Sequence, residues 1–402
     1  MSRWLYLAFF LTLFLAAVAA GHYYLWARFV RDPGWPQGWA RVAGAVLVVL
    51  ALSLPAALLA SRLAPPAAAR PLMWAAYSWM GLAFLLLVAA GLSDLFRLLI
   101  GSAARLLGGA ADPLAQLGPS DPERRQLLAR AVSVGAGAVS AGLAVHGLRG
   151  ALGEIEVRQR PIALARLPRA LDGLKVVQLS DVHVGPTLGR RFVEGIVEKT
   201  NACRPDLVVI TGDLMDGPPE ALLSALEPLS RLRARYGTFF VTGNHEYYSD
   251  WTVWRPHLES LGLRVLENER VSIGDASASF DLAGVPDPSA HRFPGSPPPS
   301  AAPIVRGRDP ERELVLLAHQ PRQIALAHEM GAGLMLAGHT HGGQVQPFGL
   351  LVALAQPYVA GHHREGPVQI YVSRGTGFWG PPMRIGAPAE ITEIVLESTR
   401  GG

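Results

Sequence analysis

Histidine and aspartate residues recur directly after short apolar runs in the second half of this 402-residue chain. One example is the heptapeptide GHTHGGQ at 338–344, which follows the apolar run Leu334–Ala337. Side chains two residues apart at the end of a strand project to the same side, and glycine lets the backbone bend and approach a ligand closely. The heptapeptide therefore indicates a metal site; a polar turn with locally hydrogen-bonded histidines is the alternative.

Seven side chains in this half have the chemistry of metal ligands and stand where apolar runs end. They are Asp181, His183, Asp213, Asn244, His319, His339 and His341. Carboxylates, imidazoles and one amide oxygen, without thiolates, suit borderline divalent metals such as Mn, Fe, Co, Ni or Zn. Seven ligands are too many for one tetrahedral ion, so the set predicts two ions bridged by a carboxylate.

Two divalent ions about 3.5–4 Å apart generate hydroxide near neutral pH and hold the oxygens of a phosphoryl group during in-line displacement. A histidine that is not a ligand is able to protonate the departing oxygen as a general acid. His245, beside Asn244, is the candidate for that role. The pattern therefore predicts hydrolysis of a phosphate ester.

The apolar runs before these residues predict strands that are buried on both faces. They are Lys175–Leu179, Leu207–Ile210, Thr238–Val241, Leu314–Ala318 and Leu334–Ala337, followed by Gln369–Val372 and Ile391–Val395. Helical patterns, at Leu188–Val197 and Leu222–Leu229, separate the first three runs. Alternating strands and helices predict an α/β fold with parallel pairing, in which ligands gather beyond the carboxyl ends of the strands.

Two loops complete the interpretation of the second half. The proline-rich segment 286–308 is expected to be a flexible surface loop without a function. The segment GTGFWGPP at 375–382 is expected either to border a pocket or to pack as an ordinary surface loop. Asp216 is expected either to support the site from behind the ligands or to be a turn residue, and Glu246 is expected to shape its loop. Tyr247 and Tyr248 either line the substrate entrance or pack.

The ordered blocks DxH, GDxxD, GNHE, an isolated strand-end histidine and GHTH make residues 174–397 similar to the calcineurin-like metallophosphoesterases. The resemblance implies a β-sandwich flanked by helices. It also implies that Asp181, His183 and His341 bind one metal, that Asp213 bridges, that Asn244, His319 and His339 bind the second metal, and that His245 is the general acid. Gly217 stands where protein Ser/Thr phosphatases of this superfamily carry an arginine, which disfavours phosphoprotein substrates.

The first 150 residues have a different composition, with only five acidic side chains. Apolar runs at Leu5–Ala20, Val42–Ala60, Leu72–Leu92 and Ala131–Leu148 approach the roughly 20 residues that cross a bilayer as a helix. We therefore expect a membrane anchor with about four transmembrane helices at 1–150, a linker or lead-in strand at 151–173 and a catalytic domain at 174–397. A cleaved signal peptide is the alternative for the first run.

Arginine counts predict the orientation of this anchor. The connections after the first and third runs are the arginine-rich ones, so by the positive-inside rule they are cytoplasmic and the catalytic domain is extracytoplasmic. Arg149, Arg158 and Arg160 weaken that argument. The pair Arg124-Arg125 resembles a twin-arginine export signal at an unusual internal position.

The leading hypothesis is a membrane-anchored phosphoesterase with two divalent metals (Mn, Fe or Zn), acting on a phosphodiester, pyrophosphate or phosphomonoester. The anchor suggests a lipid-linked substrate, and a UDP-2,3-diacylglucosamine-type pyrophosphatase is an alternative that rests on resemblance. A non-catalytic metal-binding membrane scaffold is another, and a transporter is disfavoured because His146 is the one ionisable residue noted within the apolar runs. The sequence has no basic stripe with interleaved aromatic residues, so nucleic-acid binding is not expected.

Overall fold

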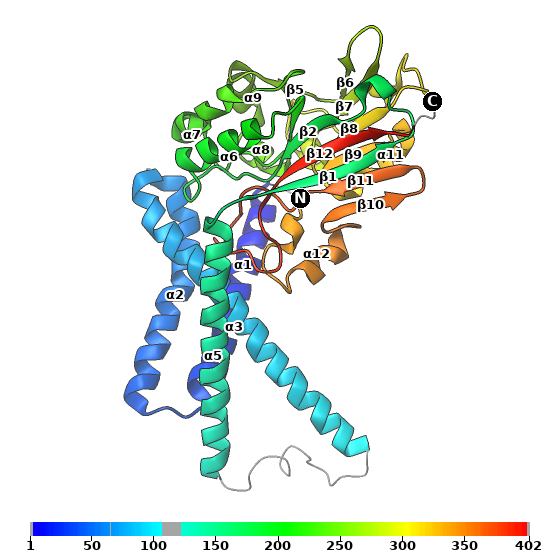
Figure 1. Ribbon diagram of the computed structural model, residues 1–402. Coiled ribbons are helices and arrows are strands. Elements are labelled where there is room, and N and C mark those ends of the chain that lie inside the picture. The colour runs from blue at the N-terminus through cyan, green and yellow to red at the C-terminus, as the bar shows by residue number, and fades with distance from the viewer. Residues whose placement is uncertain (1–2, 65, 107–121, 400–402) are drawn as a thin grey trace. The chain divides into compact units, whose positions relative to one another are not determined.

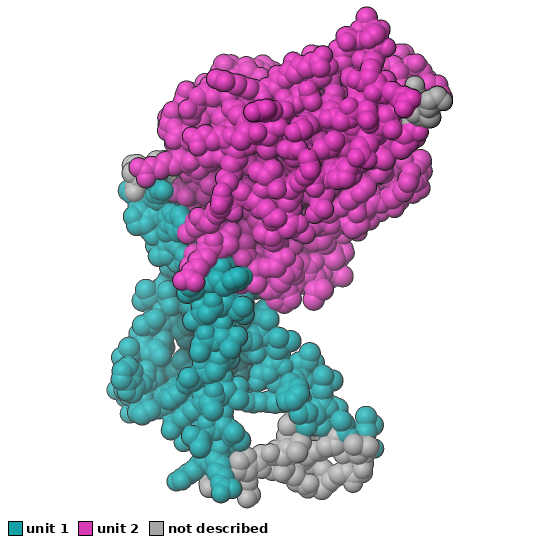
Figure 2. Space-filling view, viewed as in Figure 1, with its two compact units in different colours: residues 1–147, 380–382 teal, residues 148–379, 383–402 magenta. Residues whose placement is uncertain are grey.

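In the computed structural model of the protein, residues 3–64, 66–106 and 122–399 are described. Contacts divide the chain into two compact units, coloured in Figure 2. One, here called the helical unit, comprises residues 1–147 and 380–382. The other, here called the α/β unit, comprises residues 148–379 and 383–402.

Long apolar helices make up the helical unit (Figure 1). They are α1 (Arg3–Trp26), which continues as the π-helix η1 (Ala27–Arg31), α2 (Gln37–Leu63), α3 (Pro66–Leu106) and α5 (Pro122–Leu152). Four segments are long and apolar enough to cross a membrane, at Ala8–Arg31, Gln37–Ser61, Ala68–Ala103 and Glu123–Leu152. Each overlaps one of the four apolar runs in the sequence, so the prediction of an all-α apolar region is confirmed.

These helices expose large apolar side chains instead of burying them. Phe9 is 64% exposed, Val49 66% and Phe96 64%. Contact of such surface with water costs about 25 cal/mol per Å². Lipid chains remove that cost, so the exposed surface of the helices fits a bilayer as its solvent.

The third candidate span contains a carboxylate that the interpretation of the apolar runs did not include. Asp94 Oδ2 accepts hydrogen bonds from Tyr24 Oη at 2.5 Å and from Arg28 Nε at 2.9 Å. Ionisable groups in membrane segments are costly unless they are paired. The pairing between α1 and α3 therefore accounts for a charge at this position.

Two six-stranded sheets form the core of the α/β unit (Figure 1). The first has the order β1-β12-β2-β3-β4-β5, and the second has the order β10-β11-β9-β8-β7-β6. The first sheet contains β1 (Glu156–Leu164), β12 (Glu390–Ser398), β2 (Leu174–Leu179), β3 (Leu207–Thr211), β4 (Thr238–Val241) and β5 (Leu263–Val265). The second contains β10 (Gly361–Glu365), β11 (Val368–Val372), β9 (Leu334–Ala337), β8 (Leu314–Leu317), β7 (Ser279–Gly284) and β6 (Glu269–Gly274). Neighbouring strands are parallel except in the pairs β12–β2, β10–β11 and β6–β7.

Alternate side chains of the central strands decide how the sheets pack. Val176 and Val209 lie in one apolar core with Leu317 of the second sheet. Their chain neighbours Val177 and Ile210 lie in a separate core on the outer face. Because successive strand residues point to opposite faces, strands that are apolar throughout bury both faces. Burial of both faces therefore explains why the central strands are continuous apolar runs in the sequence.

Helices cover the outer face of each sheet. The first sheet carries α6 (Arg190–Ala202), α7 (Pro219–Leu226) and α9 (Trp251–Ser260), whose side chains share its outer core. The second carries α10 (Ala302–Val305) and α11 (Ile324–Met330). Two further short helices are α8 (Asn244–Tyr248) and α12 (Gly349–Ala355). The arrangement confirms the predicted α/β fold, a β-sandwich flanked by helices.

The expectation of a flexible surface loop at 286–308 is wrong. This segment forms the 3-10 helix η4 (Pro288–Arg292) and contains α10, and Ala290 and Ile304 are fully buried. Asp287 caps η4 by accepting from Ser289 N at 2.8 Å. The prolines were interpreted as a sign of flexibility, but proline also fixes the backbone angle φ, and the apolar residues between them pack into the core.

Trp254 provides a test of the outer packing layer. Its side chain is fully buried on α9, and its Nε1 donates to Gly217 O at 2.8 Å. We expect Trp254→Ala to destabilise the α/β unit by about 3–5 kcal/mol, and to lower the thermal midpoint of the full chain in detergent by about 10 °C. Scanning fluorimetry measures this midpoint. Val253→Ala, at a 43% exposed neighbouring position, is the control and should change it little; equal shifts would contradict this packing.

Candidate metal centre

The loops after β2, β3, β4, β8 and β9 carry the seven predicted ligands. Among the described residues, ionisable side chains form three groups whose ligand atoms lie within 4.8 Å of one another. The groups are Asp181–His183–His341, His183–Asp213–His245 and Asp213–His319–His339. Because they share His183 and Asp213, they form one continuous cluster at the carboxyl ends of strands from both sheets.

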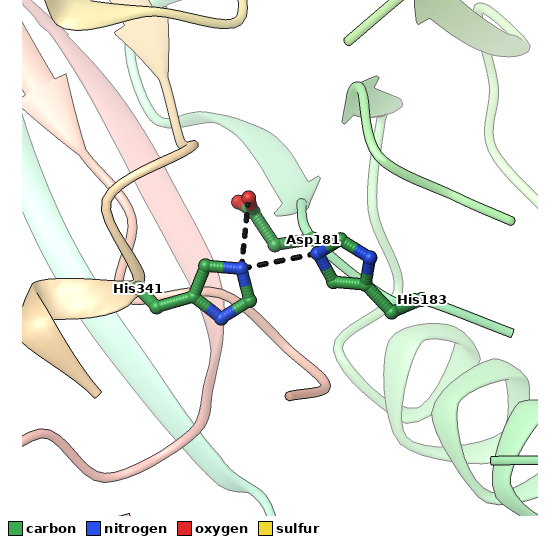
Figure 3. Close-up of side chains that lie close together, drawn as sticks. All are labelled: Asp181, His183 and His341. Carbon is green, nitrogen blue, oxygen red and sulfur yellow. Dashed lines mark hydrogen bonds and ion pairs between the residues drawn. The ribbon is translucent and has the colours of Figure 1, made fainter. Parts of the chain in front are cut away.

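The first group joins the loops after β2 and β9 (Figure 3). His341 Nε2 lies 3.4 Å from Asp181 Oδ1 and 3.1 Å from His183 Nε2. The two imidazole rings are nearly parallel, at an interplanar angle of 25°. All three residues are buried, so three polar side chains converge below the protein surface.

Asp213 belongs to both the second and the third group. Its Oδ2 lies 3.1 Å from His319 Nε2 and 3.8 Å from His183 Nε2, so one carboxylate faces both groups. His319 Nε2 also lies 3.1 Å from His339 Nδ1. The other nitrogen of His319 lies 2.7 Å from the Thr211 carbonyl. Nδ1 donates to that carbonyl, so Nε2 is the nitrogen that faces the cluster.

Asn244 is the seventh predicted ligand and begins α8. Its neighbour His245 donates its backbone N–H to Asp213 Oδ1 at 2.9 Å, which holds the start of α8 beside Asp213. The side chain of Asn244 is buried, and its Oδ1 has no hydrogen-bond partner. A buried amide oxygen without a partner is costly, and a cation is a chemically suitable partner for it.

The arrangement of nitrogen and oxygen atoms fits divalent cations. Two nitrogens about 2.1 Å from one ion, at about a right angle, lie about 3 Å apart. The pairs His183–His341 and His319–His339 both have nitrogens 3.1 Å apart. The two groups that contain these pairs, with Asp213 between them and the unpartnered oxygen of Asn244, therefore have the donor chemistry to hold metal.

Burial and mutual charge push the pKa values in the cluster apart. Burial and the neighbouring His319 lower the pKa of His339 to about 3. Burial, together with His183 and Arg384, also lowers the pKa of His341 well below its usual value. Burial raises the pKa of Asp181. Neutral imidazole is the form that binds metal, so His339 and His341 are held in the ligating state.

Asp216 connects the first group to His245. Its Oδ2 lies 3.0 Å from His183 Nδ1, and its Oδ1 contacts His245 Nδ1. Burial opposes protonation of His245, but Asp213 and Asp216 outweigh it and raise the pKa of His245 to about 9. Asp216 therefore orients two imidazole rings, which agrees with the expected supporting position behind the ligands.

Glu246 fixes the loop after β3 against the loop after β4. It is fully buried, and its carboxylate accepts from the backbone N–H groups of Asp213 (2.9 Å), Leu214 (2.7 Å) and Gly243 (2.5 Å). Burial and the charge of Asp213 raise the pKa of Glu246 to about 7. The residue shapes the loop, as the sequence pattern predicts.

The ligand-bearing loops hold strained backbone. Nine described non-glycine residues have positive φ, and five of them are predicted ligands. These are Asp181, His183, Asp213, His339 and His341. This conformation costs roughly 1–2 kcal/mol per residue. Strain of this kind persists where the surrounding structure enforces it, and it concentrates at functional sites.

Glycines in the motifs make room for carboxylates. A Cβ atom at Gly338 would lie 2.3 Å from Asp181 Oδ2, and one at Gly243 would lie 2.1 Å from Asp213 Oδ1. Both distances are too short for any side chain. The glycines of GHTH and GNHE are therefore required by the packing of the loops around Asp181 and Asp213.

Arg384 is a residue at the site that the sequence pattern did not reveal. It is buried, and its guanidinium donates to the carbonyls of Arg374 and Ala387 at 2.8 and 2.9 Å and to Gly377. Its Nη2 lies 3.5 Å from His341 Nδ1. Arg384 ties the segment around Gly377 to the GHTH loop. No spacing rule marks it, because its partners are mostly backbone carbonyls.

Residues of the 375–382 segment also border His245. The ring of Trp379 lies 5.5 Å from that of His245, and the ring of Tyr248 lies 5.3 Å from it on α8. Gln344 Nε2 donates to Trp379 O at 2.9 Å, and its Oε1 accepts from Trp379 N at 3.1 Å. Trp379 is 54% exposed and Tyr248 53% exposed. Trp379 of this segment therefore lies beside the cluster, at the position that the first of the two interpretations expects.

The remaining histidines of the α/β unit lie outside the three groups and contact their local surroundings. His328 contacts Glu365, His362 contacts Gln369, His363 stacks on Tyr358, His291 contacts Pro288 and His257 packs against Trp254. These contacts are those of surface or packing residues.

Comparison with known proteins places this geometry in a family. The calcineurin-like phosphoesterase pattern matches residues 174–343. The bovine "transmembrane protein with metallophosphoesterase domain" is 36% identical over 339 residues, which is 80% of this chain and 73% of the relative. This match is longer than the chain beyond Gly150, so it extends into the apolar helices.

Further relatives include vertebrate and bacterial proteins. The zebrafish (Danio rerio) protein of the same name is 40% identical over 64% of this chain and 61% of its own length. An "uncharacterized metallophosphoesterase" of Helicobacter pylori is 41% identical over 60% of this chain and 64% of its own. Among solved structures, a 5'-nucleotidase precursor of Thermus thermophilus aligns with a TM-score of 0.35 at 15% identity, over 56% of this chain and 54% of that one. The chain belongs to the calcineurin-like phosphoesterase family and has the candidate membrane spans that its transmembrane relatives are named for.

Proposed function

We propose that the chain is a membrane-anchored phosphoesterase that uses two divalent cations, held by Asp181, His183 and His341 on one side and by Asn244, His319 and His339 on the other, with Asp213 between them. The observation that carries the proposal is the position of Asp213 Oδ2, which faces His183 and His319 in adjoining groups. When bound, such cations stabilise the charge of phosphoryl oxygens and make water a stronger nucleophile.

His245 supplies the proton for the leaving group in this proposal. Asp216 contacts His245 Nδ1 and stabilises the protonated imidazole, while His245 Nε2 lies 3.9 Å from Asp213 Oδ2. The side chain is 14% exposed, so a phosphate ester next to Asp213 is within reach of a donor that is partly open to solvent. An oxygen that departs from phosphorus takes the proton from this nitrogen.

The pair Asp216–His245 favours an enzyme over a metal-binding scaffold. A scaffold requires the ligands, but it has no need of a non-ligating imidazole held by its own carboxylate. In this chain the pair is present, and His183 shares the same carboxylate at 3.0 Å. The site thus carries a proton donor in addition to cation ligands.

The aromatic residues beside His245 bear on the substrate. Tyr248 and Trp379 are both about half exposed and flank the proposed proton donor. Because the leaving group departs next to His245, its substituent meets these two rings. We propose a phosphodiester or pyrophosphate with an apolar or planar leaving group. A lipid-linked substrate, such as a UDP-linked diacylated sugar, belongs to this class.

Arginines gather at the ends of the first and third apolar runs and at the start of the fourth, among them Arg28, Arg31, Arg97, Arg124 and Arg125, and they support a cytoplasmic location for these ends. We propose on this basis that the α/β unit lies on the extracytoplasmic side of the cell membrane. A substrate in the outer leaflet or the cell envelope is accessible from that side.

Cation binding is testable without any substrate. We expect MnCl₂ to raise the thermal midpoint of the full chain in detergent, because a ligand at 100 times its Kd stabilises the folded state by about 2.7 kcal/mol. Asp213→Asn should abolish most of this shift, since it removes the carboxylate shared by two groups. Scanning fluorimetry and metal analysis after desalting measure the effect.

The control for this experiment is Asp275→Asn, in an exposed turn where Asp275 accepts from Ser277 N at 2.8 Å. It should keep the full manganese shift. If Asp213→Asn bound as much manganese as the control, the proposed shared carboxylate would be wrong.

Catalysis is tested by His245→Asn. We expect manganese-dependent hydrolysis of bis(p-nitrophenyl) phosphate by the full chain, and a fall in kcat of about 10²–10⁴ in the variant, the range for a lost general acid. Bound manganese should stay unchanged, because His245 is not among the proposed ligands. Parallel assays of a phosphomonoester and a nucleotide-lipid pyrophosphate identify the preferred ester. Absence of turnover on all three would sink the enzyme proposal, and an unchanged kcat would remove His245 from it.

A further inference from the structure

Helix α12 (Gly349–Ala355) has a surface that the metal site does not explain. Its sequence GLLVALA contains no polar residue, yet Leu350 is 71% exposed, Leu351 57% and Leu354 85%. Other exposed apolar side chains of the α/β unit include Phe348, directly before α12, and the more distant Val253 and Val305 on separate helices. Three exposed leucines within five residues form a concentrated apolar projection, the kind of surface that marks an interaction site.

The projection is held in place at both ends. At its start, Gln346 Nε2 donates to Gly342 O at 3.1 Å, and a Cβ atom on Gly343 would lie 2.5 Å from Gly349 Cα, so the two glycines are in close contact. At its end, the buried Gln356 accepts from Arg322 N at 3.1 Å. These contacts fix α12 to the loops that carry His341 and His319. Helix α12 is therefore held in a defined position on the surface of the α/β unit.

The exposed positions surround most of the helix. They are residues 350, 351, 353, 354 and 355, which cover about 200° of the circumference at 3.6 residues per turn. A helix that packs on protein buries an apolar stripe of about 100° or somewhat more. A fluid apolar medium can contact a wider arc than a rigid groove.

We infer that α12 dips into the lipid bilayer and holds the metal centre at the membrane surface. Four helices of the same chain are long and apolar enough to span a membrane, so a bilayer is the apolar medium that we expect next to this chain. Amphipathic or apolar helices that bury one side among acyl chains are an established mode of membrane contact. Helix α12 begins at Gly349, eight residues after His341 in the sequence.

The inference also narrows the substrate class, in a step that rests on the proposed function. A centre held by α12 at the bilayer surface is placed at the depth of lipid headgroups. The phosphate ester that it meets there is one carried on a lipid. The lipid contact itself is independent of catalysis and is measured separately.

The experiment uses the full chain in nanodiscs of phosphatidylethanolamine and phosphatidylglycerol, with brominated or unmodified acyl chains. Cys203, the one cysteine of the chain, is replaced in the background variant Cys203→Ser. Leu350→Cys, Leu351→Cys and Leu354→Cys are each labelled with an environment-sensitive fluorophore. Val49→Cys, 66% exposed on α2, is the lipid-facing reference, and Val253→Cys, 43% exposed on α9, is the matched position on the α/β unit.

We expect bromination to quench the label at the three α12 positions and at position 49, and to leave position 253 unchanged. Quenching at position 49 without quenching at any α12 position would overturn the inference. In that case, a blue-shifted label on α12 would identify a protein cover, such as a second copy of the chain, and an unshifted label would identify water. Because no turnover is measured, loss of the phosphoesterase proposal would leave this result intact.

Discussion

The α/β unit depends on the compensation of charge in a buried cluster. Asp181 and Asp213 are almost completely inaccessible, and imidazoles from four different loops surround them. A buried carboxylate is costly unless it is paired and hydrogen-bonded. Here the backbone N–H of His339 donates a hydrogen bond to Asp181 Oδ1 at 2.9 Å, and the backbone N–H of His245 donates one to Asp213 Oδ1 at 2.9 Å. The unpartnered oxygen of Asn244 shows that protein donors alone do not satisfy the cluster, and cations complete it in our proposal.

The surrounding structure is arranged to enforce this concentration of polar groups. Two sheets buried on both faces bring strand ends from distant parts of the sequence to one edge. Predicted ligands such as Asp181 and His341 then take up left-handed backbone conformations, and Glu246 pins two of the loops together through three backbone N–H groups. Local strain of a few kcal/mol is sustained because the sheets on either side are rigid and fully packed.

Three features mark the side of the cluster that is open to solvent. His245, held by Asp216, lies on the side that is partly open to solvent, and Tyr248 and Trp379 stand next to it. Trp379 is joined through Gln344 to the loop that leads into α12. His245, the two aromatic side chains and the exposed leucines are therefore linked through contacts with one loop system.

The sequence alone predicted the central apolar strands, the four apolar helices and the identity of the clustered residues, because these depend on local periodicity and on ordered motifs such as GNHE and GHTH. It did not predict the strands β5, β6, β7 and β10. It failed at 286–308, where proline content predicted a loose loop and burial of Ala290 and Ile304 decided otherwise. Only the tertiary structure decided that Arg384 holds the GHTH loop and that the leucines of α12 stay exposed. An apolar run has the same sequence signature whether it is buried or exposed, and a side chain that binds distant carbonyls leaves no spacing to recognise; both are settled by long-range packing.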